Sequence, residues 1–282
     1  MKQTLPSKII ALLLAGLWSI QSQTGWSAPV PETTGQSGAS RQTNPMSHPI
    51  GEDVERVLGE SISLEIFSRY GGLYQNEALT RYVTLVGKTL AEVTDRPALE
   101  YRFAILNSQE EHAFAAPGGF VFVTLGLLQT LRNEAELAGI LGHELAHINR
   151  KHLLNSWQRL SGDSTPPPFT MAGITQNPNL LEPAIEQMAD MLFTRGMDKR
   201  LEHEADLDGL EYALRAGYHP AGLHYYLQRL ARVQGSIPSV FFTTHPPSTE
   251  RIQQMIGRLD KQPDTDRLAL LAERFKRNLP SQ

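Results

Sequence analysis

The sequence predicts an α+β fold that is mostly helical, with one small sheet. Apolar residues recur at helical spacing through most of the chain after about residue 50. Only two short runs, residues 99–106 and 120–123, have the composition of strands, and a Pro-Gly-Gly turn lies between them. Residues 143–147 read His-Glu-Leu-Ala-His inside one expected helix, so their two histidines share a helix face.

The helices are predicted by apolar spacing and by the signals at their ends. Asn133 opens Asn-Glu-Ala-Glu, which is typical of a capping box with Asn133 as N-cap and Glu136 as the third helical residue. Gly217 is expected to end one helix, and Pro220 to open the next. The expected helices cover residues 52–70, 76–91, 125–131, 133–160, 183–194, 198–216 and 249–259, with one more from residue 220.

The first 48 residues predict an export signal and a linker. Residues 1–28 hold two lysines and then an apolar run that is too short to cross a membrane but is typical of a signal peptide. An uncleaved N-terminal anchor is the alternative. Residues 29–48 are rich in Pro, Gly, Ser, Thr and Gln and predict a disordered linker. After the signal, no apolar stretch has the length of a membrane span.

The rest of the chain predicts one domain at residues 49–262 and a C-terminal helical tail at residues 263–282. Residues 161–179 contain Ser-Gly-Asp-Ser-Thr-Pro-Pro-Pro, which cannot continue a helix. A loop of this length between two predicted helices is either a lid over a site or a plain flexible insertion.

Composition excludes several classes of protein. A formal net charge of −4 gives no basic surface for nucleic acid. The absence of cysteine excludes disulfides, thiolate zinc sites and a lipid-modified N-terminal cysteine.

Residues 143–147 form the pattern HExxH, which indicates metal-assisted hydrolysis, most directly of a peptide bond. His143 and His147 can hold one metal ion because they lie on one helix face. Glu144 points about 100° away around the helix and can act on a metal-bound water without being a ligand. Zinc with an open coordination position makes water a nucleophile near neutral pH. The alternative is a structural helix whose histidines find ordinary hydrogen bonds.

A third ligand must be His, Glu or Asp, because the chain has no cysteine. On a helix, Glu202 and Asp206 share a face, from which Glu202 can reach the metal. Asp206 can accept the second ring N–H of a ligand histidine. His203 and Glu204 point elsewhere on the same helix. A solvated acidic face has the same spacing, so these residues alone leave the ligand open.

Four motifs resemble, in order, those of the M48 family of zinc metallopeptidases, over about residues 50–260. His112 stands where the family often has Asn. The resemblance implies a zincin-like metallopeptidase domain, with the small sheet beside the active-site helix and one Zn²⁺ per chain. The motifs are HExxH, the Glu-x-x-x-Asp of residues 202–206, Ala-Phe-Ala-Ala-Pro-Gly-Gly at residues 113–119 and His-Pro-Pro-Ser-Thr-Glu-Arg at residues 245–251.

The resemblance also implies roles for single residues. It makes His143, His147 and Glu202 the zinc ligands and places Asp206 behind a ligand histidine. It implies an edge strand that pairs with substrate at Gly119, Phe120, Val121, Phe122 and Val123.

His245 has three interpretations. It donates to the oxyanion, or it binds zinc as a fourth ligand that plugs the resting site, as in some periplasmic members of the family, or it is a turn residue before Pro246. Arg251 is expected to hold an acidic partner or to contact the oxyanion. Arg195 and Arg200 are expected to be structural.

The predicted function is a zinc-dependent endopeptidase of the periplasm that acts on unfolded or misassembled exported proteins, with Glu144 as general base. A peripheral position at the membrane is compatible with it. The alternative is a chaperone or assembly factor for outer-membrane proteins with mostly latent protease activity. The expected partners are unfolded proteins and the outer-membrane assembly machinery, and nucleic acid is not among them.

Overall fold

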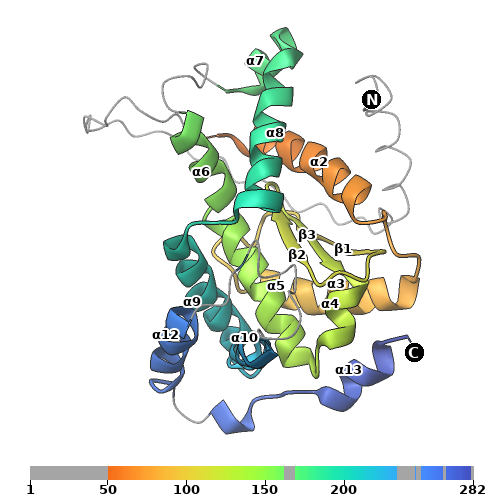
Figure 1. Ribbon diagram of the computed structural model, residues 1–282, viewed down its shortest axis with the longest axis vertical. Coiled ribbons are helices and arrows are strands. Elements are labelled where there is room, and N and C mark those ends of the chain that lie inside the picture. The colour runs from red at the N-terminus through yellow and green to blue at the C-terminus, as the bar shows by residue number, and fades with distance from the viewer. Residues whose placement is uncertain (1–49, 162–168, 234–244, 246–248, 263–264, 281–282) are drawn as a thin grey trace, which may run out of the picture. The chain divides into compact units, whose positions relative to one another are not determined.

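The computed structural model describes residues 50–161, 169–233, 245, 249–262 and 265–280. These residues belong to one unit, Pro45–Gln282. A three-stranded sheet lies among their helices (Figure 1), so the prediction of a mostly helical α+β fold with a small sheet is confirmed. The predicted signal peptide and linker lie outside the described residues. Among the helices that the structure describes, none has the length and apolarity of a membrane span.

The sheet has the strand order β1-β3-β2, with β1 at Arg102–Leu106, β2 at Ala113–Ala116 and β3 at Phe120–Thr124. β3 runs parallel to β1 and antiparallel to β2. The turn between β2 and β3 needs its two glycines, because Gly118 and Gly119 have φ of 75° and 97°. A Cβ on Gly119 would also lie 2.4 Å from the carbonyl oxygen of Glu100.

The prediction that Gly119–Val123 forms an edge strand is wrong. β3 pairs along both sides, because β1 adds to it in parallel through Arg102↔Phe120 to Leu106↔Thr124. The edges are therefore β1 and β2. The strand composition rule missed β2, since Ala-Phe-Ala-Ala lacks β-branched residues.

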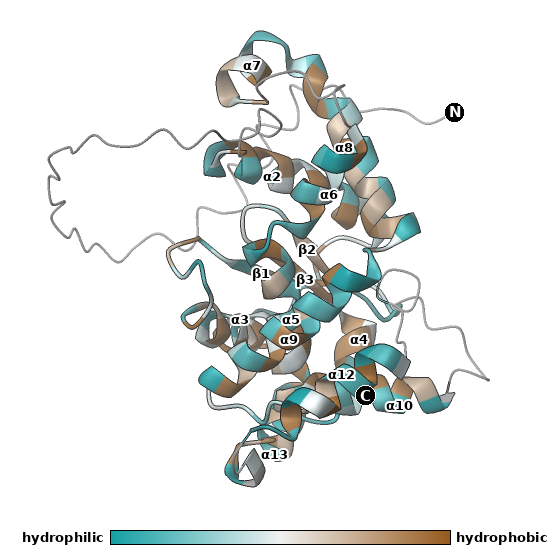
Figure 2. Ribbon diagram, turned by 90° about the vertical axis from the view of Figure 1, so that its left-hand side faces the viewer, coloured by the Kyte–Doolittle hydropathy of each residue, from teal (hydrophilic) through white to brown (hydrophobic). Residues whose placement is uncertain are grey.

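Alternate residues of the sheet face two different apolar cores. Val121 and Val123 join the core formed by α3 (Glu77–Ala91), α5 (Glu134–Asn149), α9 (Lys199–Arg215) and α10 (Gly222–Val233). Phe120 and Phe122 join the core formed by α2 (Glu52–Arg69), α6 (His152–Ser161) and α8 (Leu181–Asp190). This alternation follows from the two-residue period of a strand. Figure 2 shows the mixed apolar and polar positions that α2 and α8 have as amphipathic helices.

α5 crosses the middle of the fold and has the capped start that the sequence predicts. The side chain of Asn133 accepts a hydrogen bond from the backbone N–H of Glu136 at 2.9 Å. The Glu136 carboxylate accepts the N–H of Arg132, one residue before the N-cap, at 2.9 Å. Nearly every residue of α5 is buried, which is the expectation for a helix at the centre of a core.

The prediction of one helix over residues 133–160 is wrong, because the chain breaks between α5 and α6. α5 ends at Asn149, and Lys151 has a left-handed φ of 52°. The Lys151 side chain makes an ion pair at 2.8 Å with the buried Glu55 of α2. This ion pair and a hydrogen bond from the same Lys151 amine to the carbonyl oxygen of Ile50 stabilise the chain where α5 ends and α6 begins.

The remaining helices match the predicted ones within a few residues. α4 (Leu125–Thr130) follows β3, α12 (Thr249–Leu259) follows α10, and α13 (Ala272–Asn278) buries Phe275 in the first core. α8 ends in a π-helical turn at Met191–Arg195. Residues 162–168 of the predicted lid lie outside the described residues, but residues 171–176 form α7 (Met171–Gln176) rather than a loop.

Candidate metal centre

The site lies where α5 and α9 cross. α5 contributes His143, Glu144 and His147, and α9 contributes Glu202. Gly142 and Gly209 permit the close approach of the two helices, and they have no side chain to hold them apart. A Cβ on Gly209 would lie only 2.7 Å from the backbone nitrogen of His143. A Cβ on Gly142 would lie 2.8 Å from the carbonyl oxygen of Gly209.

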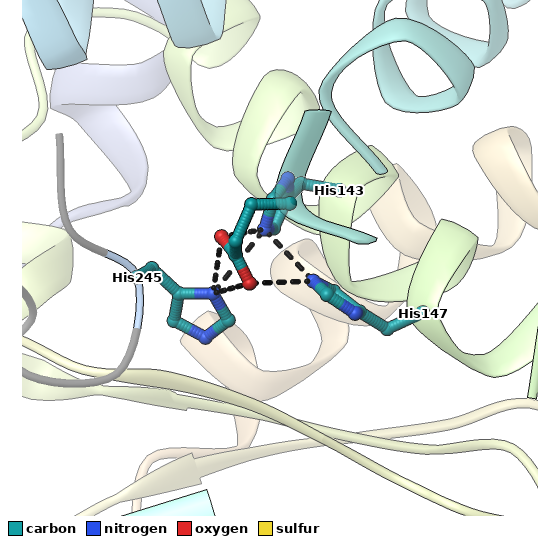
Figure 3. Close-up of side chains that lie close together, drawn as sticks. His143, His147 and His245 are labelled. Carbon is teal, nitrogen blue, oxygen red and sulfur yellow. Dashed lines mark hydrogen bonds and ion pairs between the residues drawn. The ribbon is translucent and has the colours of Figure 1, made fainter. Parts of the chain in front are cut away.

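Four side chains bring one ligand atom each to a common point: His143, His147, Glu202 and His245, all buried. Figure 3 shows the three labelled rings turning nitrogen atoms toward one another. The Nε2 atoms of His143 and His147 are 3.0 Å apart, and each lies 3.5 Å from a Glu202 oxygen. His245 Nδ1 lies 3.3 Å from His143 Nε2 and 3.1 Å from both Glu202 oxygens.

These separations fit a tetrahedral ion. Ligand atoms at about 2.0–2.2 Å from tetrahedral zinc would be about 3.3–3.6 Å from one another. The ligand-atom separations given above lie between 3.0 and 3.5 Å. Three imidazole nitrogens and one carboxylate oxygen are also donors that zinc accepts. The residues present therefore fit a zinc ion with a closed set of four ligands.

A second layer of charge supports the cluster from behind. Asp206 Oδ1 lies 3.1 Å from Nδ1 of His143. The buried Arg251 of α12 donates to both Asp206 oxygens at 2.7 Å, and its third nitrogen lies 3.1 Å from Glu202. Arg251 therefore has the acidic partner that the sequence led us to expect, Asp206, and it contacts Glu202 as well.

The electrostatics of the cluster favour positive charge at its centre. Burial opposes the protonation of His143, but the carboxylates of Asp206 and Glu202 outweigh it and raise the pKa to about 9. For Glu202, burial is outweighed by the charges of His245 and Arg251, so its pKa is lowered. Burial and the charge of His143 together lower the pKa of His147. A bound cation would supply the positive charge that both carboxylates favour, with every imidazole in its neutral form.

Glu144 is buried beside the cluster without belonging to it. Its Oε1 lies 3.8 Å from Nε2 of His245 and accepts no hydrogen bond from any residue that the structure describes. Burial raises the pKa of this carboxyl, and the charges of His245 and His143 oppose the rise. An unpaired carboxylate oxygen in a buried site is costly unless a ligand or water completes it.

A cleft opens beside the cluster, between β2 and the helices of the second core. Glu144, His147 and His245 are among the residues that line it. Its apolar lining includes Ala115, Ala116, Leu153, Met191, Leu192 and Met197. The predicted substrate strand Gly119–Val123 does not line this cleft, whereas the edge strand β2 does.

The other residues singled out from the sequence lie elsewhere. Arg195 makes an ion pair with Asp190 on the surface. The backbone N–H of Arg200 donates to the side chain of Asp198, which is the N-cap of α9. His112 is buried next to Phe114, with ring centroids 5.1 Å apart and planes at 18°. Sequence reasoning missed His152, whose ring touches that of His147, because it assumed one straight helix across residue 151.

The family follows from a comparison of the whole chain with known families. The model of peptidase family M48 matches residues 77–259, which include both helices of the site. The chain belongs to peptidase family M48. The motif resemblance seen in the sequence is therefore confirmed, and the metal-binding geometry lies inside the M48 region.

Curated relatives of this M48 chain are proteases. The beta-barrel assembly-enhancing protease of Yersinia pestis is 25% identical over 269 residues, 89% of this chain and 52% of the relative. The mitochondrial metalloendopeptidase OMA1 of Schizosaccharomyces pombe is 27% identical, over 72% of this chain and 60% of the relative. The metalloprotease LoiP of Escherichia coli is 23% identical, over 72% of this chain and 80% of the relative. The chain spans about half of the Yersinia pestis protein.

Proposed function

We propose that the chain is a zinc-dependent endopeptidase that hydrolyses peptide bonds in unfolded or misassembled exported proteins. The observation that carries the proposal is the tetrahedral spacing of four ligand atoms beside a buried carboxylate with an unpaired oxygen. His143, His147 and Glu202 would hold the zinc. Zinc in such a site supplies Lewis acidity to a carbonyl group and lowers the pKa of water.

Glu144 is the proposed general base. Its unpaired Oε1 can take a proton from a water molecule and then deliver it to the leaving amine of the cleaved bond. Its neighbour His143 points to the ligand cluster instead, because adjacent residues lie about 100° apart around a helix. Asp206 and Arg251 hold His143 and Glu202 in place, so the ligand set is built before substrate arrives.

His245 supports a latent resting state. Its Nδ1 lies at hydrogen-bond distance from Glu202 and His143, in the place of a fourth ligand. A zinc ion with four protein ligands has no position for the nucleophilic water. We therefore favour the plug over both the turn residue and the oxyanion donor. The plug also favours the second candidate function, a chaperone or assembly factor that holds clients while its protease activity is latent.

The cleft supports an extended, apolar substrate. β2 is an edge of the sheet among the described residues, although its residues are buried, and a substrate strand that adds to its backbone would depend little on side chains. The apolar lining beyond β2, including Leu153 and Leu192, would accept an apolar side chain next to the cleaved bond. Unfolded proteins supply both features.

The biological setting is also a proposal. The predicted signal peptide supports export to the periplasm. One relative is named a beta-barrel assembly-enhancing protease, which supports a role beside outer-membrane assembly. Unfolded or misassembled outer-membrane proteins, together with that assembly machinery, are then the proposed partners.

Cleavage of a chemically unfolded protein by the zinc-loaded chain tests this proposal. We expect His245→Ala to cleave faster than the wild type, and Glu144→Gln to bind zinc but lose cleavage by at least about 100-fold. If Glu144→Gln cleaves at the wild-type rate, the mechanism is wrong. If His245→Ala loses activity with its zinc retained, His245 is an oxyanion donor and not a plug. Client stabilisation that persists in Glu144→Gln would support the chaperone function.

A further inference from the structure

His152 lies directly behind the second histidine of the HExxH motif. The break at Lys151 turns the start of α6 back toward α5, so that His152 is buried with 2% of its surface exposed. Its Nδ1 lies 3.0 Å from Nδ1 of His147. The two rings have centroids 5.0 Å apart and planes at 77°, so the contact joins the ring nitrogens rather than stacked faces.

The direction of the hydrogen bond follows from the ligand cluster. Nε2 of His147 points to His143 and Glu202. If that nitrogen binds a metal, its lone pair is used, and the ring proton must be on Nδ1. The Nδ1–H of His147 then donates to Nδ1 of His152. His152 must accept, which places its own proton on Nε2.

Glu204 lies on the far side of His152. Its Oε2 is 3.6 Å from Nε2 of His152, and that nitrogen has no hydrogen-bond partner among the residues that the structure describes. Glu204 is half-exposed, and Arg150 lies 3.6 Å from its other oxygen. The carboxylate can therefore accept the Nε2 proton after a small side-chain movement, which favours the tautomer that His147 requires.

We propose that His152 is a positioning residue that fixes the tautomer and ring orientation of His147 for metal binding, with Glu204 fixing the tautomer of His152 in turn. The two ligand histidines of α5 are then supported differently. His143 is backed by the carboxylate of Asp206, and His147 by a neutral imidazole. The proposal rests on the proposed function only in taking His147 as a metal ligand.

The zinc affinity of the full chain tests this proposal without any need for catalysis. In His152→Phe, a ring of similar shape lacks the acceptor, so the N–H of His147 loses its partner. We expect zinc to bind about 10- to 100-fold more weakly, the usual cost of removing a group that orients a metal ligand. In His152→Asn, the amide oxygen can take the place of Nδ1, and we expect most of the affinity to return. In Glu204→Gln, the zinc affinity should fall by less than about tenfold.

Matched variants separate this role from general damage. His224→Phe removes another buried histidine, and Glu211→Gln removes another half-exposed acid of α9. Both should bind zinc like the wild type. Competition with a fluorescent chelator gives the affinities, circular dichroism confirms folding, and the visible spectrum of the Co²⁺-loaded protein should change in His152→Phe and return in His152→Asn.

Two results would overturn the proposal. One is a folded His152→Phe that binds zinc as tightly as the wild type. The other is a His152→Asn that loses as much affinity as His152→Phe, since the acceptor would then be irrelevant. If the wild type itself binds no zinc, the proposed function fails instead.

Discussion

Replacing Gly209 with alanine should disturb the metal centre from a distance. The added Cβ would lie 2.7 Å from the backbone nitrogen of His143 and 2.9 Å from the carbonyl carbon of Gly142. Carbon atoms in ordinary contact are about 3.4 Å or more from such atoms, so α9 must move away from α5 by about 0.7 Å. The Cβ meets backbone atoms and has a fixed position on its own backbone, so no rotamer change can relieve the contact.

This displacement is large for a metal site. Metal ligands keep their distances to within about 0.2 Å, and Glu202 moves with α9. We expect Gly209→Ala to weaken zinc binding by about 10- to 100-fold, comparable to the loss of a group that orients a ligand. Overpacking costs about 1–3 kcal/mol of stability, and the better helix propensity of alanine offsets up to about 1 kcal/mol of it.

Gly257→Ala in α12 is the matched control. No atom of the described residues lies within 4 Å of a Cβ at Gly257, so this variant gains helix propensity without a steric clash. In urea unfolding, the free energy of unfolding of Gly209→Ala should therefore be about 1–3 kcal/mol lower than that of Gly257→Ala. Chelator competition should show weaker zinc binding only in Gly209→Ala. Equal stability and equal zinc affinity in the two variants would refute the close-crossing argument.

Two further predictions concern buried charge. Glu55→Gln should lower stability by about 2–3 kcal/mol at neutral pH, less than for a wholly buried pair because Arg96 and Lys151 remain partly exposed. Burial favours the protonated Glu55, but Arg96 and Lys151 outweigh it and lower the pKa. The stability from Glu55 is therefore present above the unfolded-state pKa and lost as pH falls through the folded-state pKa. Urea unfolding of both proteins from pH 7 to pH 3 checks this, and a constant difference would contradict it. Arg251→Leu should lower the free energy of unfolding of the metal-free protein by about 3–5 kcal/mol, because the buried Asp206 carboxylate loses its guanidinium partner and keeps only His143. Zinc should restore part of this loss. A thermal midpoint like that of the wild type would contradict this expectation.

The residues predicted best from the sequence are those whose contacts are local. The HExxH pattern places His143 and His147 on one face whatever the rest of the chain does. The Glu202–Asp206 spacing likewise presents two carboxylates from one face of α9. Which carboxylate faces the cluster could not be derived from spacing, because it depends on how α9 crosses α5.

The wrong predictions depend on contacts between distant segments. β3 is central because β1, some twenty residues earlier, adds to it in parallel, and no local pattern reveals that pairing. The break before α6 is held by Lys151 and Glu55, which are far apart in the sequence. Without the break, His152 would lie about 140° around the helix from His147 and could not face it. A lone histidine five residues after an HExxH motif gives too weak a signal to predict this contact.

The location of zinc in a crystal of the metal-loaded protein, from anomalous diffraction at the zinc edge, tests the central claim most directly. We predict a single peak per chain at about 2.0–2.2 Å from Nε2 of His143, Nε2 of His147 and an oxygen of Glu202. In the resting protein, His245 should fill the fourth position. A peak elsewhere, or no peak in protein soaked with stoichiometric zinc, would contradict a zinc peptidase site at the crossing of α5 and α9.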